Sequence, residues 1–535
     1  MKHLYTYIIA IFILMGASCS DFLDTVPRDA LSPNTTWKTE EDAQNFLIGC
    51  YDGWVSDGAI LYWDCTSDYG FNYHIHEGYR NIANGGMTAS NAVANFYSFG
   101  MIRRCNDFLT NIEDIEFADP KEKDNMIGQV KTIRAFQYFD KNWKYGGIPI
   151  IESYETAEEA QVPRDTEEAV KKFIFDELDA AIPLLNKEPK ARGYIAKGTA
   201  LALKMRSALY YEDYERAKSA AQEIMDLGLY ELDSSYENVF TIAGQGSKEI
   251  ISSYQRDENL YSQWVIGAMY NNADGGWSSI VPTKNLVDAY EMANGLTIDE
   301  PGSGYDATYP FANRDPRMAM TILYPGMEWQ GSVLNTLDAT INGGKNPNNP
   351  DDADNASKTG LTWAKYLAPK AQYPNMWDTG VSVIIFRYAE VLLTFAEAEN
   401  ELNGPSTKVY NMLNQLRNRV GMPNVDEAKY NTKETLRELI RRERGVELAG
   451  EGLRRDDILR WKTDNGSLLA ETVLNGPLVR FEGTIDYSET DPFKRAVISG
   501  TTLVEQREFK KTHRYLPIPQ SARDKNPKLE QNDGY

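Results

Sequence analysis

Residues 201–228 read LALKMRSALYYEDYERAKSAAQEIMDLG, and this stretch decides the fold. Its apolar residues recur at helical spacing on two faces, Leu201, Met205, Ala208 and Leu209 on the first and Ala217, Ala221 and Ile224 on the second. The polar pair Glu212-Asp213 marks a turn between them. Small alanines at the crossing allow two helix backbones to approach closely. The stretch therefore predicts a hairpin of two short antiparallel helices.

Helical periodicity continues on both sides of this hairpin. It dominates residues 36–230, and it returns in 381–535, where helices are expected over 387–403 and 435–449. The hairpin resembles a tetratricopeptide repeat, in which stacked helix pairs bury a common core. We therefore expect a mainly α fold, a tetratricopeptide-like frame of helical hairpins that carries long irregular loops and little β structure.

A charged run in the last of these helices includes Arg441, Arg442, Glu443 and Arg444. Such a run usually forms a solvated helix face, and some Arg–Glu pairs are expected to cross between helices. Residues 231–380 differ in character, because Gly, Asn, Pro and Trp dominate them. We interpret this region as loops on the ligand-binding side, packed with both helical regions into one compact body.

The N-terminus indicates export. Residues 1–18 combine Lys2, a short apolar run and small residues before Cys19, and they are too short to span a hydrocarbon core of ~30 Å. We interpret 1–18 as a lipoprotein signal peptide, Cys19 as the lipid-attachment site and 19–35 as a lipidated tether. An acylated Cys19 would hold the chain on a membrane.

The net charge restricts the possible ligands of the chain, and the cysteine count restricts its disulfide pairing. The chain has 56 basic and 78 acidic residues and a formal net charge of −22, so it repels phosphate backbones and is not expected to bind nucleic acid. Besides Cys19 it has Cys50, Cys65 and Cys105. An odd number leaves at least one free thiol, and whether Cys50 pairs with Cys65 stays open.

Catalytic and metal-binding patterns are weak. The sequence has four histidines, no zinc-type pair on a helix, no Gly-x-Ser-x-Gly elbow and no phosphate loop. His74 and His76 alternate in an extended segment, and we interpret them as loop or ligand-contact residues. The acidic run 351–355 offers ligands for a structural Ca²⁺ but lacks the EF-hand positions, and no other cofactor is expected. No carboxylate pair stands out for glycoside hydrolysis. These observations favour a protein that is not an enzyme.

Aromatic residues supply the candidate ligand site. Five of the ten tryptophans lie within 264–377, in glycine-rich segments whose exposed rings would suit the C–H faces of sugars. The leading stacking candidates are Trp277, Trp329 and Trp363, with Trp63, Tyr73, Trp377 and Arg80 as neighbours. The alternative is that these rings pack in the core, as large aromatics mostly do. That interpretation is preferred for Trp37, Trp143 and Trp461, which fall within helical patterns.

A series of short motifs runs through the chain in a fixed order. They are Arg134-Ala135-Phe136-Gln137-Tyr138-Phe139, Tyr145-Gly146-Gly147-Ile148-Pro149, Arg314-Asp315-Pro316-Arg317, Arg387-Tyr388-Ala389-Glu390, Arg417-Asn418-Arg419, Glu443-Arg444 before Glu447-Leu448-Ala449, Asp457-Ile458-Leu459-Arg460-Trp461, and the tail from Pro517-Ile518-Pro519 to Gln531-Asn532-Asp533-Gly534-Tyr535. Together they resemble the SusD/RagB family of surface lipoproteins over nearly the whole mature length. A slight departure is Asp533, where the family's tail usually has proline.

The resemblance implies a location and a partner. Such proteins sit on the outer face of the outer membrane, cap a TonB-dependent transporter of the SusC type, and capture glycans or occasionally peptides for import. Their shared motifs are mostly architectural, so no ligand-binding residue is carried over from the family. Two other functions remain open, a surface glycoside hydrolase and a helical-repeat scaffold without a small ligand.

Overall fold

Two antiparallel helices stand where the sequence predicts a hairpin, α9 (Lys197–Tyr210) and α10 (Tyr214–Asp226). The carboxylate of Asp213 accepts a hydrogen bond from the backbone N–H of Arg216 (3.2 Å) and caps α10. The alanines of the two helices that are fully buried are Ala200, Ala202, Ala208, Ala217, Ala220 and Ala221. The predicted hairpin is confirmed.

The structure is a computed structural model that describes residues 37–154, 156–261, 264–337, 356–373 and 375–535. The predicted signal peptide, the tether with Cys19 and the acidic run 351–355 lie outside the described residues.

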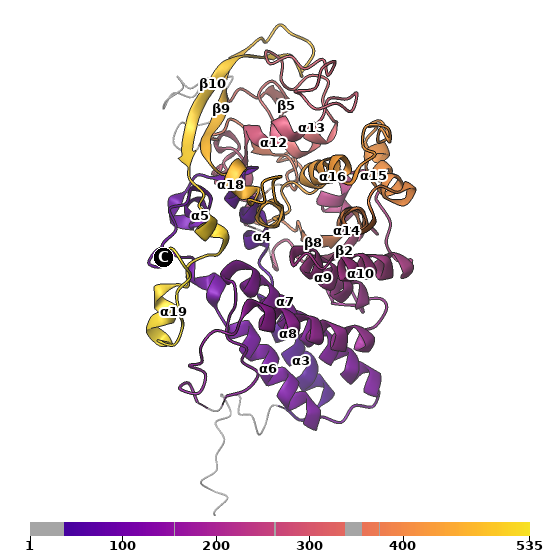
Figure 1. The fold of residues 1–535 in the computed structure, drawn as a ribbon, viewed down its shortest axis with the longest axis vertical. Coiled ribbons are helices and arrows are strands. Elements are labelled where there is room, and N and C mark those ends of the chain that lie inside the picture. The colour runs from indigo at the N-terminus through magenta and orange to yellow at the C-terminus, as the bar shows by residue number, and fades with distance from the viewer. Residues whose placement is uncertain (1–36, 155, 262–263, 338–355, 374) are drawn as a thin grey trace, which may run out of the picture.

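Long helices form a curved stack around this hairpin (Figure 1). The helices that precede it are α3 (Glu40–Tyr51), α6 (Gly100–Asn111), α7 (Pro120–Tyr145) and α8 (Glu167–Ala181). Those that follow are α14 (Tyr388–Asn403), α15 (Thr407–Arg419) and α16 (Lys433–Glu447). Because α10 packs directly against α14, the two helical regions meet although more than a hundred residues separate them in sequence. The predicted tetratricopeptide-like frame is confirmed.

Shorter helices lie between and beside the strands. They are α4 (Asp57–Trp63), α5 (Tyr79–Asn84), α11 (Val265–Met269), α12 (Lys284–Ala289), α13 (Arg317–Thr321), α17 (Arg454–Arg460), α18 (Ala470–Val473) and α19 (Gln520–Lys525). The last of these lies beside the N-terminal half of the molecule, where the chain ends (Figure 1).

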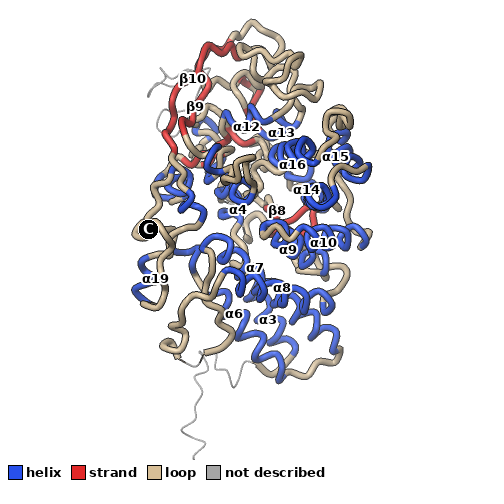
Figure 2. The backbone as a smooth tube through the Cα atoms, viewed as in Figure 1, coloured by secondary structure: helices blue, strands red, loops and turns tan. Residues whose placement is uncertain are grey.

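Strands pair only two at a time in the described residues. The antiparallel pairs are β1 (Gly70–Asn72) with β3 (Ile280–Pro282), β2 (Ile250–Tyr254) with β8 (Val383–Arg387), β4 (Ile322–Leu323) with β7 (Thr362–Trp363), β5 (Glu328–Trp329) with β6 (Ser332–Val333), and β9 (Gly476–Ile485) with β10 (Ala496–Arg507). The β9–β10 ribbon runs along one edge of the molecule, and the other pairs are short (Figure 2). The small share of β structure agrees with the prediction.

The β2–β8 pair closes a long excursion of the chain. Residue Tyr254 at the end of β2 lies opposite Val383 at the start of β8. The segment 255–382 therefore leaves the helical frame and returns to it at one place. All of the loop tryptophans considered as ligand residues, apart from Trp63, belong to this excursion.

Two large apolar clusters form the core. The first joins side chains of α3, α6 and α7 to those of α14, α15 and α16, and Trp143 lies within it. The second is formed largely by side chains of the excursion itself and includes Trp363 and Tyr366. Trp143 and Trp461 are buried, as predicted, whereas Trp37 is only half-buried and packs against the edge of the first cluster.

The cysteines do not pair as Cys50 with Cys65. The Cys50 thiol donates to the carbonyl of Arg104 (3.8 Å), and the Cys65 thiol donates to the carbonyl of Phe71 (3.4 Å). The two thiols belong to different apolar clusters. All three described cysteines, Cys50, Cys65 and Cys105, are free and buried.

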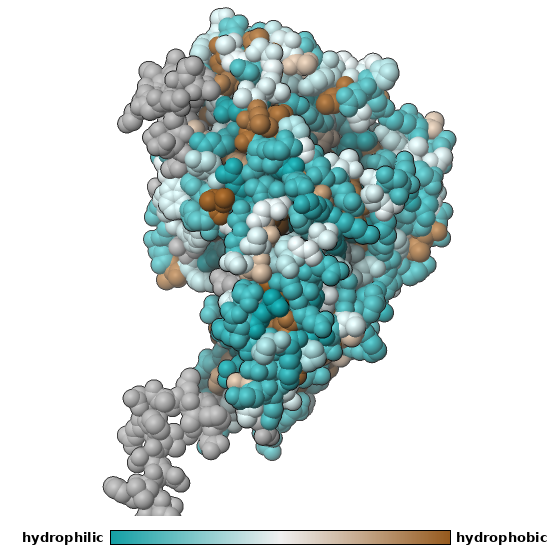
Figure 3. Space-filling view, turned by 60° about the vertical axis from the view of Figure 1, so that its left-hand side comes forward, coloured by the Kyte–Doolittle hydropathy of each residue, from teal (hydrophilic) through white to brown (hydrophobic). Residues whose placement is uncertain are grey.

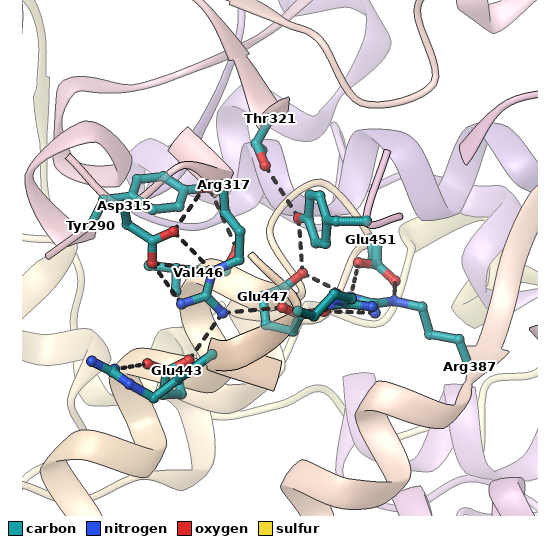
Figure 4. A network of polar contacts seen from close by, with 12 residues as sticks. Tyr290, Asp315, Arg317, Thr321, Arg387, Glu443, Val446, Glu447 and Glu451 are labelled. Carbon is teal, nitrogen blue, oxygen red and sulfur yellow. Dashed lines mark hydrogen bonds and ion pairs between the residues drawn. The ribbon is translucent and has the colours of Figure 1, made fainter. Parts of the chain in front are cut away.

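A buried ion-pair network joins the helical frame to the excursion (Figure 4). Arg317 of α13 donates to Glu443 (3.0 Å) and Glu447 (3.1 Å) of α16, and also binds Asp315 (2.6 Å). Arg387, at the end of β8, donates to Glu447 (2.8 Å) and Glu451 (2.7 Å). The network places charged side chains where the apolar clusters meet.

This network corrects one expectation about the charged run in α16. Glu443 and Arg444 are fully buried instead of solvated. The physical reason is that each faces an opposite charge from another element, Arg417 for Glu443 and Asp457 for Arg444. The expected crossing of Arg–Glu pairs between helices is confirmed.

The surface is largely polar. On the face shown in Figure 3, hydrophobic residues form small separate patches in a hydrophilic surround. Of the helices in the described ranges, none has the length and apolar character needed to span a membrane.

Candidate functional site

A tight loop after α11 forms the base of the candidate site. The side chain of Asn271 accepts a hydrogen bond from the backbone N–H of Asp274 (2.9 Å) and starts a short 3₁₀ turn, Asn272–Asp274. Gly275 then adopts a φ of 94°, in the left-handed region that favours glycine. A Cβ on Gly276 would collide with the backbone of Tyr270. The loop thus needs both glycines, and it turns the next residue, Trp277, toward solvent.

Trp277 pairs with Trp377 across the loop. Their ring centroids are 4.5 Å apart with an interplanar angle of 49°, and Trp277 is 43% exposed. Trp377 is half-buried and lies against Gly267 of α11, where a Cβ would collide with the indole. The half-buried ring supports the exposed one, so the pair presents an aromatic surface held in place from behind.

Trp329 lies on the other side of the same loop. Its indole N–H donates to the Asp274 carboxylate (2.7 Å), and Lys370 donates through Nζ to the Asp274 carbonyl (2.7 Å). Burial raises the pKa of Asp274 above its ordinary value, against the lowering effect of the indole hydrogen bond. The half-buried Trp329 is therefore fixed in orientation beside one carboxylate and one ammonium group.

Tyr73 reaches the site through strand pairing. Its backbone N–H donates to the carbonyl of Ser279 (3.0 Å), which continues the β1–β3 ladder toward Trp277. The ammonium of Lys358 lies 4.4 Å from the Tyr73 ring centroid. Trp277, Trp377, Trp329 and Tyr73 therefore all contact or adjoin the segment 270–279, and their role in ligand binding stays a prediction.

Arg80 supports this region from behind. It donates to the Glu505 carboxylate (2.6 Å) and to the Tyr73 carbonyl (3.2 Å), and its guanidinium lies 5.2 Å from the Phe71 ring centroid. These contacts tie β10 to the end of β1. Arg80 thus positions Tyr73, and its side chain is only partly exposed.

Two nominated tryptophans do not belong to the exposed aromatic surface around Trp277. Trp363 is 2% exposed and lies in β7 opposite Ile322, within the second apolar cluster. Trp63 is also buried, and its indole N–H donates to Asp456 (3.0 Å). Trp363 is enclosed by the second apolar cluster, and Trp63 is 7% exposed. The prediction that either ring belongs to one exposed stacking surface with Trp277 is wrong for this structure.

Sequence reasoning missed the polar members of the site. Asp274 and Lys370 surround Trp329, and Gln330 accepts a hydrogen bond from the Lys370 backbone (3.2 Å). The sequence around Asp274 could have indicated its role, because an acidic residue before Gly-Gly is typical of a tight turn. No sequence pattern indicates the role of Lys370, since only folding brings it to Asp274, almost a hundred positions earlier in the chain.

Metal binding has no geometric support in the described part of the chain. No group of three His, Cys, Asp or Glu side chains there lies close enough together to hold an ion. His74 and His76 lie with ring centroids 5.6 Å apart at a loop. The candidate calcium ligands 351–355 are outside the described residues and stay a prediction.

Comparisons with known proteins point to one family. The family model described as "SusD family" matches residues 236–535, and that described as "Starch-binding associating with outer membrane" matches residues 87–298. SusD-like protein P25 of Formosa agariphila is 24% identical over 497 residues, which cover 86% of this chain and 90% of the relative.

Solved structures share the fold. A SusD-like carbohydrate binding protein from Bacteroides fragilis superimposes with a TM-score of 0.79 at 28% identity, covering 93% of this chain and 100% of that chain. Surface glycan-binding protein A from Bacteroides uniformis gives a TM-score of 0.69 at 17% identity, covering 92% of this chain and 99% of that chain.

Proposed function

This chain belongs to the SusD family, and from that premise we propose that it binds an oligosaccharide at the cell surface without chemically altering it. The observation that carries the proposal is the exposed Trp277–Trp377 pair, with Trp329 held beside Asp274. A relative of the same fold at 28% identity is named as carbohydrate binding, which supports the ligand class.

The site has the chemistry that a sugar needs. An indole face packs against ring C–H groups, while the exposed Lys370 donates to hydroxyls and the buried Asp274 carboxylate holds the Trp329 indole in place. Stacking on one exposed aromatic contributes ~1–3 kcal/mol, by analogy with measured base stacking. The site is an aromatic platform with polar groups at its edge, which suits a chain of sugar units better than one small enclosed ligand.

The cellular setting is part of the proposal. Cys19 carries the lipid that anchors the chain to the outer membrane, and the body faces the cell exterior. A SusC-like TonB-dependent transporter receives the glycan. One matching family description refers to association with the outer membrane, which supports this location.

A glycan array followed by titration tests the ligand site. The mature chain with Cys19→Ala is screened, and Trp277→Ala is titrated with the best glycan. Loss of ~1–3 kcal/mol of stacking corresponds to about five- to a hundredfold weaker binding. Tyr154→Ala is the control, because Tyr154 is similarly exposed but lies in the N-terminal helical region.

Three results would contradict the site or the function. Equal affinity of Trp277→Ala and the wild type would place the site elsewhere. Release of shorter sugars from the bound glycan would show a hydrolase. Binding of peptides but of no glycan would identify a peptide-binding member of the family.

The lipid anchor has its own test. Cys19→Ala should move the protein from the membrane fraction to the soluble fraction, and retention on membranes would refute lipidation at this residue.

A further inference from the structure

A partly open cavity of about 210 Å³ shares no lining residue with the aromatic platform and lies between α7, the residues before α4, and the start of α17. Aromatic side chains form one part of its wall, among them Trp54, Trp63, Phe136, Phe139 and Trp143. Ligand pockets for drug-sized molecules are ~300–1,000 Å³. The cavity therefore has room for a single ring and not for an oligosaccharide.

One lysine in the wall of this cavity has an unmatched charge. Lys141 is 4% exposed, and its ammonium donates to the side-chain carbonyl of Gln137 (2.9 Å). Among the described residues, no carboxylate lies within ion-pair distance of it. Burial lowers the pKa of Lys141 to about 8. A buried ammonium without a counter-ion costs several kcal/mol, which a bound anion would offset.

Apart from Asp456, the other charged groups of the wall are already paired with opposite charges. Lys144 pairs with Asp140, Arg206 pairs with Glu390 (2.6 Å), and Glu451 pairs with Arg387 (2.7 Å) and Lys365. Lys141 is therefore the cation among them that is left to receive an anionic group.

Asp456 sets the other polar boundary of the cavity. Its two carboxylate oxygens accept hydrogen bonds from the indoles of Trp143 (2.9 Å) and Trp63 (3.0 Å). Burial raises the pKa of Asp456 to about 6. Each oxygen keeps a further lone pair, so a hydroxyl group inside the cavity would find an acceptor here.

We propose that this cavity binds an acidic monosaccharide, a hexuronate, with its carboxylate on Lys141 and its ring against the tryptophan wall. The ring hydroxyls then donate to Asp456. A hexuronate combines the three features that the wall demands: one negative charge, a ring with C–H faces, and hydroxyl donors. The proposal does not depend on glycan binding at the Trp277 platform.

Calorimetry on the Cys19→Ala mature chain tests the proposal with glucuronate, glucose and benzoate as probes. Glucuronate should bind, and glucose should bind at least about tenfold more weakly because it lacks the charge that Lys141 receives. Lys141→Met should abolish the difference between the two sugars. The same variant should unfold at a higher temperature than the wild type, because it removes an unpaired buried charge.

Two controls separate this site from the platform. Trp277→Ala should leave glucuronate binding unchanged, and Lys141→Met should leave oligosaccharide binding unchanged. Equal glucuronate affinity of wild type and Lys141→Met, or no heat with any probe, would overturn the proposal and leave a water-filled cavity. Benzoate binding as tightly as glucuronate would overturn the assignment to a sugar.

Discussion

Arg387 and Glu447 form an ion pair across 60 residues of sequence, with Nη1 and Oε1 2.8 Å apart and neither side chain more than 1% exposed. Arg387 directly precedes α14, and Glu447 ends α16. Arg317 and Arg419 also donate to the Glu447 carboxylate. All four residues lie in the short motifs by which the chain resembles its family. The four motifs that contain these residues therefore form the contact between the helical frame and the excursion. They carry no information about the ligand.

Removing the charge of Glu447 should destabilise the whole body. Glu447→Gln leaves three buried arginines short of a counter-charge, and breaking such a buried arrangement costs ~3–5 kcal/mol. Denaturant unfolding monitored by circular dichroism measures the loss. Glu438→Gln, at an exposed position of the same helix, should change stability by less than ~0.5 kcal/mol. A loss below ~1 kcal/mol for Glu447→Gln would contradict the structural role of the network.

Trp363 and Trp277 should respond in opposite ways to alanine. Trp363→Ala opens a cavity in the second apolar cluster and should cost ~3–5 kcal/mol of unfolding free energy. Trp277→Ala removes a ring that is 43% exposed and should cost much less. Thermal and denaturant unfolding of both variants measures the contrast. Equal losses would mean that the Trp277 ring is a structural element and not a free face for a ligand.

Ionisation of Glu397 should make the free energy of unfolding fall as the pH is lowered into the acid range. Burial alone would raise the pKa of Glu397, but the Arg460 guanidinium and its hydrogen bonds lower it to about 2. Because the folded-state pKa lies below the unfolded one, the carboxylate stabilises the fold above pH ~4.5, and this contribution is lost as pH falls toward 2. It corresponds to about 3 kcal/mol.

The comparison of wild type with Glu397→Gln isolates that contribution. The difference in unfolding free energy between the two proteins should shrink by about 3 kcal/mol from pH 6 to pH 2. The Glu438→Gln variant should show no such trend. A constant difference for Glu397→Gln across this range would mean that the carboxylate is not held ionised by Arg460.

The three cysteines of the body should be unreactive until the chain unfolds. Burial raises the pKa of the Cys65 and Cys105 thiols well above their ordinary value, so little thiolate forms. In the Cys19→Ala chain, a thiol reagent should label none of Cys50, Cys65 and Cys105 in the native state and all three in denaturant. Recovery of only one thiol after unfolding would reveal a disulfide and contradict the free cysteines of the structure.

Local pattern was enough to predict the frame. The α9–α10 hairpin could be predicted because its apolar spacing, its alanines and its Asp213 cap all act within thirty residues. The helix 387–403 was expected within one residue of α14 for the same reason. These features depend on neighbours along the chain, which a sequence shows directly.

Burial of charge and of tryptophan could not be predicted in this way. Glu443 and Arg444 look like a solvated face until Arg417 and Asp457 approach from other elements. Trp363 sits near glycines as Trp277 does, yet the pairing of β7 with β4 covers it. Of the candidate site, the position of Trp277 could be predicted because its own loop sets it. The position of Lys370 could not, because a distant segment of the chain brings it to Asp274.

The β2–β8 pair has a consequence for how such a protein diversifies. Since 255–382 begins and ends at adjacent backbone positions, its exposed loops can change in length without stretching any helix of the frame. The contacts of Arg317 with α16 and the packing of Trp363 must be kept, because they join the segment to the rest of the core. A new specificity then requires no new scaffold, only different loops between Tyr254 and Val383.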